Sequence, residues 1–95
     1  MSHAEQEPDR SRPGTAEVIR RALEQFAALT GKQPEGVTGV RATDDGGWSV
    51  LVDVLELERV PSSTSVLATY RVDLDGQAEL RSYERLRRYT RSAID

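Results

Sequence analysis

The side chains best suited to binding chemistry lie near the end of the chain, where arginines and tyrosines interleave. They are Arg81, Tyr83, Arg85, Arg87, Arg88, Tyr89 and Arg91. A guanidinium group pairs with carboxylates or phosphates, and a tyrosine ring adds flat contact area or stacks on a base. The segment therefore indicates a surface for an acidic protein partner, a surface for nucleic acid, or ion pairs with the chain's own Glu56, Glu58 and Glu84. The net charge of -3 argues against nucleic acid as the main partner.

The acidic residues do not combine into a catalytic or metal site. Glu56 and Glu58 would share one face of a strand, but no third catalytic group accompanies them. The pair Asp44–Asp45 and the nearby Asp53 lack the spacing of a calcium loop. The single histidine, His3, lies in a polar N-terminal stretch, and the chain has no cysteine. We therefore predict a protein that is not an enzyme, with no catalytic residue, no metal site and no cofactor.

The length and composition suit one small soluble domain. The chain has 95 residues, of which 37% are hydrophobic and 31% are charged. No apolar run approaches the roughly 20 residues of a membrane span, and the N-terminus lacks the apolar segment of a signal peptide. The absence of cysteine fits a reducing compartment. We expect a cytoplasmic protein that does not enter a membrane, and association with a larger particle stays open.

The N-terminal part predicts a tail followed by one amphipathic helix. Residues 1–14 are charged and proline-containing, which predicts a disordered tail. Thr15 stands where a helix N-cap is expected, and apolar residues then recur at helical spacing as far as Thr30. Gly31 can end the helix in the left-handed conformation.

Four strands follow, and the second carries the strongest signal. Trp48, Val50, Val52 and Val54 alternate along the expected strand 48–59, because successive strand side chains point to opposite faces. The other expected strands are 37–43, 66–74 and one that begins at residue 78; the connections are a loop over 32–36, a turn over 44–47 and a link over 61–65 that starts at a proline. We predict an α+β fold in which the N-terminal amphipathic helix packs on one face of a four-stranded antiparallel β-meander. The predicted domain spans residues 15–91, and residues 92–95 form a C-terminal tail.

A three-residue loop over 75–77 gives the last hairpin its most apolar register. It pairs Leu74 with Ala78, Val72 with Leu80 and Val66 with Leu86. The predicted core face is Val40, Ala42, Trp48, Val50, Val52, Val54, Val66, Ala68, Tyr70, Val72, Leu74, Leu80 and Leu86. The same register sets Arg71 opposite Arg81, an unfavourable like-charge pair. Either an anion bridges these two arginines or the register is wrong.

The register also leaves apolar side chains on the face away from the helix. They are Leu51, Leu55, Leu57, Leu67 and Tyr83, with Tyr89 at the end of the row, and they lie beside Asp53, Arg71, Asp73, Arg81, Arg85 and Arg87. Apolar groups ringed by charge on an open sheet indicate a partner or self-association surface. The alternative is that the C-terminal segment or the N-terminal tail folds over them.

An ordered set of short motifs resembles the gas vesicle protein O family over about residues 15–91. The set is Trp48 with its valines, Glu56, Glu58-Arg59-Val60-Pro61, Leu67-Ala68, Tyr70 with Val72, Gly76, Tyr83-Glu84-Arg85 and Arg88-Tyr89-Thr90-Arg91. The resemblance implies a non-enzymatic accessory protein that acts in the assembly or regulation of gas vesicles. The chain departs from the family pattern at Arg71, where an acidic residue is usual, and at Asp53, where glutamate is usual.

These observations lead to one functional hypothesis and one alternative. The hypothesis is a cytoplasmic adaptor that binds other gas vesicle proteins, shell or accessory, with self-association left open. Its expected partner-binding residues are Leu55, Leu57, Leu67, Arg81, Tyr83, Arg85, Arg88, Tyr89 and Arg91. The alternative is a small regulator that binds nucleic acid through the same arginines and tyrosines.

Overall fold

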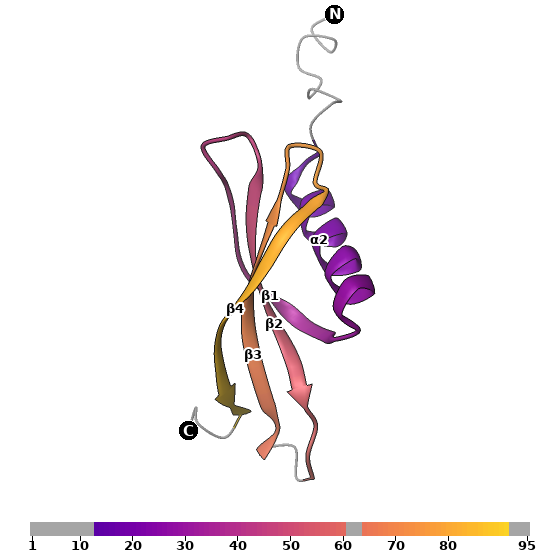
Figure 1. The fold of residues 1–95 in the computed structure, drawn as a ribbon, viewed down its shortest axis with the longest axis vertical. Coiled ribbons are helices and arrows are strands. Elements are labelled where there is room, and N and C mark those ends of the chain that lie inside the picture. The colour runs from indigo at the N-terminus through magenta and orange to yellow at the C-terminus, as the bar shows by residue number, and fades with distance from the viewer. Residues whose placement is uncertain (1–12, 61–63, 92–95) are drawn as a thin grey trace, which may run out of the picture.

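The computed structural model describes residues 13–60 and 64–91, and it confirms the predicted α+β fold. The elements are helix α2 (Thr15–Thr30) and strands β1 (Gln33–Ala42), β2 (Trp48–Leu57), β3 (Val66–Leu74) and β4 (Leu80–Thr90). The strands form one antiparallel sheet in the order β1-β2-β3-β4, with α2 against one face (Figure 1). The predicted tails, apart from residues 13–14, and residues 61–63 of the predicted link lie outside the described residues.

Helix α2 contacts the sheet along one apolar stripe. Val18, Ala22 and Phe26 are spaced four apart and are fully buried. The predicted N-cap at Thr15 is wrong, because Thr15 is already helical and Gly14 is the cap, without a side-chain hydrogen bond. The predicted helix end is confirmed at Gly31, which has a φ of 72° and donates its N–H to the Ala27 carbonyl.

The two central strands form the core that their alternation predicts. The fully or almost fully buried side chains of β2 and β3 on the helix side are Val50, Val52, Val54, Ala68, Tyr70, Val72 and Leu74. Val40, Trp48 and Leu80 pack against this core from its edges. Ala42, by contrast, is exposed, which contradicts its predicted place in the core.

The outer bounds of two strands differ from the prediction. β1 begins at Gln33, so the predicted loop over 32–36 is largely strand. Pro34 lacks an N–H, and it is accommodated because β1 is an edge strand with a free side. β2 ends at Leu57, two residues before the predicted end.

The loop between β3 and β4 contains five residues, 75–79, and it changes the register of the last hairpin. Strand β4 pairs Leu74 with Leu80, Val72 with Tyr83 and Val66 with Thr90. The structure therefore contradicts the predicted three-residue loop and its pairs, Leu74 with Ala78, Val72 with Leu80 and Val66 with Leu86.

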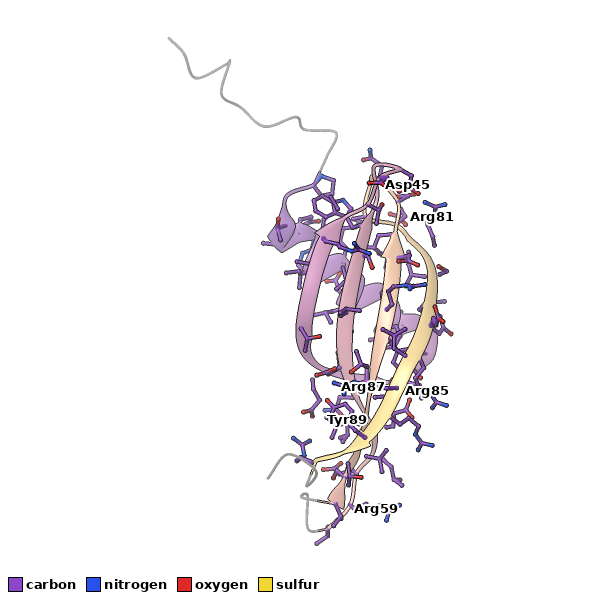
Figure 2. The ribbon with its side chains drawn as sticks, turned by 90° about the vertical axis from the view of Figure 1, so that its left-hand side faces the viewer. Asp45, Arg59, Arg81, Arg85, Arg87 and Tyr89 are labelled. Carbon is purple, nitrogen blue, oxygen red and sulfur yellow. The ribbon has the colours of Figure 1, made fainter. Side chains whose placement is uncertain are left out.

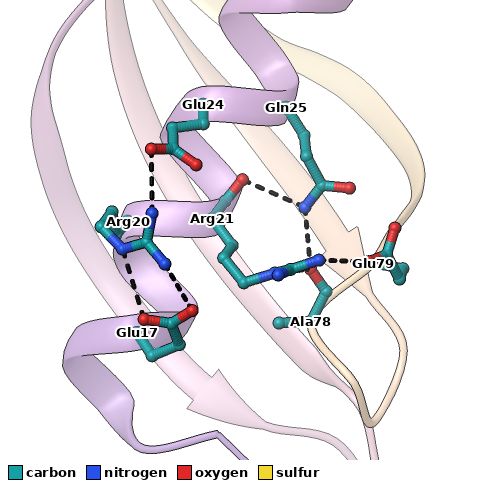
Figure 3. A network of polar contacts seen from close by, with 7 residues as sticks. All are labelled: Glu17, Arg20, Arg21, Glu24, Gln25, Ala78 and Glu79. Carbon is teal, nitrogen blue, oxygen red and sulfur yellow. Dashed lines mark hydrogen bonds and ion pairs between the residues drawn. The ribbon is translucent and has the colours of Figure 1, made fainter.

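The reason for the longer loop is its contact with the helix. Ala78 adopts a positive φ of 66° and is fully buried. The Gln25 side chain of α2 donates to the Ala78 carbonyl at 2.7 Å and accepts the Leu80 N–H at 2.9 Å. Arg21 also donates to the Ala78 carbonyl and pairs with Glu79 (Figure 3). The helix therefore binds the loop through polar contacts that strand periodicity does not predict.

Several predicted neighbours change with this register. Leu86 is 46% exposed and is not part of the core. Tyr83 lies on the helix side, opposite Val72, and not on the open face. Arg71 pairs with Glu84 at 2.8 Å, so the unfavourable Arg71–Arg81 pairing does not occur.

The turn between β1 and β2 uses its two glycines for different reasons. Gly46 has a φ of 89°, which side chains rarely allow. Gly47 is buried against β3, where a Cβ atom would strike the backbone carbonyl oxygen of Leu74. The predicted turn is thereby confirmed.

Replacing Gly47 by alanine should destabilise the fold. We expect Gly47→Ala to lower the free energy of unfolding by about 1–3 kcal/mol, since backbone must move to admit the methyl group. Gly36→Ala is the matched control: its Cβ would meet open space, so the change should be within about 1 kcal/mol of neutral. Urea unfolding followed by circular dichroism measures both, and equal stabilities would contradict the close approach at Gly47.

Candidate protein-binding surface around strand β4

A buried carboxylate at the end of β2 contacts donors from β3, from β4 and from the segment that follows α2. Glu56 has a side chain that is only 6% exposed. One of its oxygens accepts the Tyr70 hydroxyl at 2.8 Å and lies 3.4 Å from Lys32 Nζ. The other oxygen accepts from Arg85 at 3.1 Å and lies 3.3 Å from Arg88 Nε. We call these five residues the Glu56 cluster.

The cluster connects the end of the helix to three strands. Lys32 follows α2, Glu56 belongs to β2, Tyr70 to β3, and Arg85 and Arg88 to β4. Burial disfavours the charged form of Glu56, but the Tyr70 hydrogen bond, Lys32 and Arg85 outweigh it and hold the pKa of Glu56 below its usual 4.5. Burial, followed by the bond to Glu56, raises the pKa of Tyr70. The carboxylate is therefore held ionised in a largely enclosed site.

Contacts among three aromatic rings connect the Glu56 cluster to the helix. Phe26 of α2 lies 5.1 Å from the Tyr70 ring and 5.5 Å from the Tyr83 ring, measured between centroids. Tyr83 remains 43% exposed, so one part of its ring packs and another part faces solvent. Edge-on and tilted aromatic contacts of this kind add to the energy of burial.

The start of β4 is held by a second carboxylate. Arg81 donates to Asp45 of the β1–β2 turn at 3.0 Å, at the end of the sheet where both are labelled in Figure 2. The Thr43 hydroxyl, the Gly47 N–H and Arg81 lower the pKa of Asp45 to about 2. Both side chains are more than half exposed, so this pair is a surface contact.

The face of the sheet away from the helix carries a different set of contacts. Thr69 donates to Asp53 at 2.7 Å, and Arg87 lies 4.8 Å from the centroid of the Tyr89 ring. Burial and the neighbouring Asp53 carboxylate raise the pKa of Tyr89. Leu67 is only 5% exposed on this face. Much of the open face is therefore packed by its own side chains.

The nine expected partner-binding residues do not form one surface. Leu55, Leu67 and Tyr89 lie on the open face, whereas Tyr83, Arg85 and Arg88 lie on the helix side. Leu57 lies beyond a bulge at the end of β2, opposite Val66, and is 44% exposed. Arg81 and Arg91 lie near opposite ends of β4, and Arg91 contacts Glu35 at 3.4 Å.

Sequence reasoning missed Lys32 as a member of the site and did not assign Glu56 a central role. Pairing of the arginines with Glu56 was one of the open alternatives, and it is confirmed for Arg85 and Arg88. The even-numbered position of Glu56, in step with Val50, Val52 and Val54, was the available signal that it points to the helix side.

Comparison with known proteins gives the family. A family model described as gas vesicle synthesis protein GvpO matches residues 1–95. The chain belongs to this family. Gas vesicle protein O of a Streptomyces species is 45% identical over 94 residues, which cover 99% of this chain and 73% of the relative. No solved structure matches the chain significantly.

Two archaeal relatives are more distant. Gas vesicle protein O of Haloferax mediterranei is 31% identical over 90% of this chain and 61% of its own length. Gas vesicle protein O1 of Halobacterium salinarum is 35% identical over 75% of this chain and 59% of its own length. The matches thus span less than two thirds of each archaeal protein.

Membership of the GvpO family supports a role in gas vesicle formation as an accessory protein, which is not an enzyme class. Residues 13–60 and 64–91 include no helix that is long and apolar enough to cross a membrane. In the same residues, no group of three or more acidic or histidine side chains could hold a metal ion.

Acid should remove the contribution of Glu56 to stability. Its folded-state pKa is lowered, so the stabilisation is complete above the unfolded-state value of 4.5 and is lost as pH falls through the folded-state value. We expect Glu56→Gln to cost about 1–3 kcal/mol near neutral pH, because the donors lose a charged acceptor. The difference between parent and variant should shrink below pH 4.5.

Urea unfolding of both proteins at a series of pH values tests this expectation. Asp45 and Asp75, whose pKa values are also lowered, titrate in parent and variant alike, so they cancel in the difference. A difference that stays constant into acid would show that the charge of Glu56 does not stabilise the fold.

Proposed function

We propose that this chain acts in gas vesicle formation as a non-enzymatic adaptor that binds other gas vesicle proteins through strand β4 and the surface beside it. Membership of the GvpO family supports the role in gas vesicle formation. The exposure of strand β4 supports binding to other proteins. Eight consecutive residues of β4, 81–88, are exposed. They include Tyr83 and Leu86, which are 43% and 46% exposed. This exposed edge strand is the observation on which the proposal rests.

Charged side chains on an edge strand also have a simpler role, since they discourage unwanted strand pairing. Arg81, Arg85 and Arg87 on β4 can serve that purpose. Exposed leucine and tyrosine do not, because apolar side chains on an edge favour association. Arginine and aromatic residues are enriched in protein interfaces, and the arginines and Tyr83 of β4 match that composition.

The alternative of a nucleic-acid-binding regulator has less support. A phosphate backbone is usually followed by a row of free cations along a groove. Arg81 on β4 and Arg91 just after β4 each contact a carboxylate of this chain, and Glu84 interrupts the row of arginines. The net charge of -3 also opposes binding to a polyanion.

A single substitution on β4 tests the adaptor. The tagged chain would be captured from cells that express the neighbouring gas vesicle genes, with and without nuclease. We expect the parent to recover gas vesicle proteins in both conditions, and Leu86→Asp to recover at least about tenfold less, the effect of losing ~1.4 kcal/mol at an interface.

The matched control is Leu29→Asp, since Leu29 is 62% exposed on the last turn of α2. It should leave recovery unchanged. Equal recovery by Leu86→Asp and the parent would contradict β4 as the binding surface. Recovery of nucleic acid without gas vesicle proteins would favour the regulator, and recovery of neither would contradict both proposals.

A further inference from the structure

The Glu56 cluster contains more positive than negative charge. Lys32, Arg85 and Arg88 all contact the single carboxylate of Glu56. In the other ion pairs of the described residues, each participating arginine has at least one carboxylate that no other cation shares. On the helix surface, Arg20 pairs with both Glu17 and Glu24 (Figure 3). Among the ion pairs of the described residues, Glu56 is therefore the carboxylate that more than one cation shares.

In the Glu56 cluster, the cations and not the carboxylate have hydrogen-bonding groups left for a further ligand. A carboxylate has about four acceptor sites, and Glu56 already has four donors within 3.4 Å. A guanidinium group has five N–H donors, and Arg85 donates one of them to Glu56. A further ligand at this place must supply hydrogen-bond acceptors, and the surplus of positive charge favours an anionic one.

The cations are accessible to such a ligand. The side chains of Lys32, Arg85 and Arg88 are 35%, 46% and 52% exposed, although Glu56 beneath them is 6% exposed. Lys32 follows the C-terminal end of α2, Arg85 and Arg88 belong to β4, and Figure 2 shows Arg85 on the outer strand of the sheet. Glu56 thus holds their charged groups together from below, which reduces the entropy that a ligand must remove on binding.

We propose that the Glu56 cluster is the receptor for a carboxylate side chain on an acidic segment of a partner protein. Lys32, Arg85 and Arg88 bind the incoming carboxylate, and Glu56 acts as the positioning residue that keeps them close together. Leu57, next to Glu56 in the chain, and Leu86, next to Arg85, are exposed and add apolar contact beside the charges. This inference rests on the adaptor proposed above and specifies the chemistry of its partner.

Two other occupants fit the geometry less well. Nucleic acid needs cations along a track, whereas these three charges converge on one carboxylate and the chain as a whole is acidic. A second copy of the chain would bring like charges together if the cluster lay on the two-fold axis of a self-complementary interface. An acidic protein segment meets neither difficulty.

A titration of the full chain tests the receptor directly. The probes are an oligoglutamate peptide of about eight residues, an oligoglutamine peptide of the same length and a single-stranded oligothymidylate of matched charge. The readout is the NMR signals of the arginine Nε–H groups. We expect oligoglutamate to shift the Arg85 and Arg88 signals, with an affinity that falls as salt is added, and oligoglutamine to shift neither.

Matched variants distinguish binding at the Glu56 cluster from non-specific attraction between opposite charges. The double variant Arg85→Gln, Arg88→Gln should bind oligoglutamate at least about tenfold more weakly. Arg20→Gln and Arg41→Gln, combined, remove the same charge elsewhere on the exposed surface and should have little effect. Equal weakening by the two double variants, or stronger binding of oligothymidylate than of oligoglutamate, would overturn the inference. So would concentration-dependent shifts of Arg85 and Arg88 without any probe, which would assign the cluster to self-association.

The capture experiment distinguishes failure of this inference from failure of the adaptor. If Arg85→Gln, Arg88→Gln recovers gas vesicle proteins as well as the parent does, while Leu86→Asp does not, the carboxylate receptor is wrong and the adaptor stands. If the parent itself recovers no gas vesicle protein, the adaptor is wrong. A weakened double variant beside an unchanged Arg20→Gln, Arg41→Gln control supports both.

Discussion

One helix, α2, packs on one face of a sheet whose strands are longer than the helix. Most of the architecture follows from that constraint. The buried stripe Val18–Phe26 of α2 lies over the central valines of β2 and β3, where burial is complete. A helix rises about 1.5 Å per residue and a strand about 3.3 Å, so the 16 residues of α2 are shorter than the 10-residue β2. The strands consequently extend past the helix (Figure 1). The uncovered end cannot be stabilised by helix packing, and other interactions take its place.

Polar contacts hold the sheet where the helix does not cover it. At the end of β2, Glu56 binds side chains from β3, from β4 and from the residue pair that follows α2. A buried carboxylate is unfavourable unless its hydrogen bonds are complete, and here both oxygens have donors. Gln25, in the C-terminal half of the helix, connects α2 to the β3–β4 loop at the start of β4. These contacts leave β4 anchored at both ends, while its outer side stays exposed.

The same arrangement links stability to the proposed binding role. Cations that stabilise Glu56 have donors to spare, so one cluster can support the fold and still bind a ligand. The open face is less available, because Leu67 is buried and Tyr89 packs with Arg87 and Asp53. The helix side of β4 is therefore a better candidate for the binding surface than the leucines of the open face.

The sequence by itself determined the helix, the central strands and the α+β fold, because these depend on local periodicity. The alternation from Trp48 to Val54 and the apolar stripe from Val18 to Phe26 can be recognised from residues that are close together in the sequence. The ordered set of motifs from Trp48 to Arg91 likewise sufficed to indicate the gas vesicle protein O family. The tertiary structure decided the register of β4 and the face on which Tyr83 lies. Those depend on the burial of Ala78 and on its bond to Gln25, which is 53 residues away in the chain, and strand periodicity carries no information about such a contact.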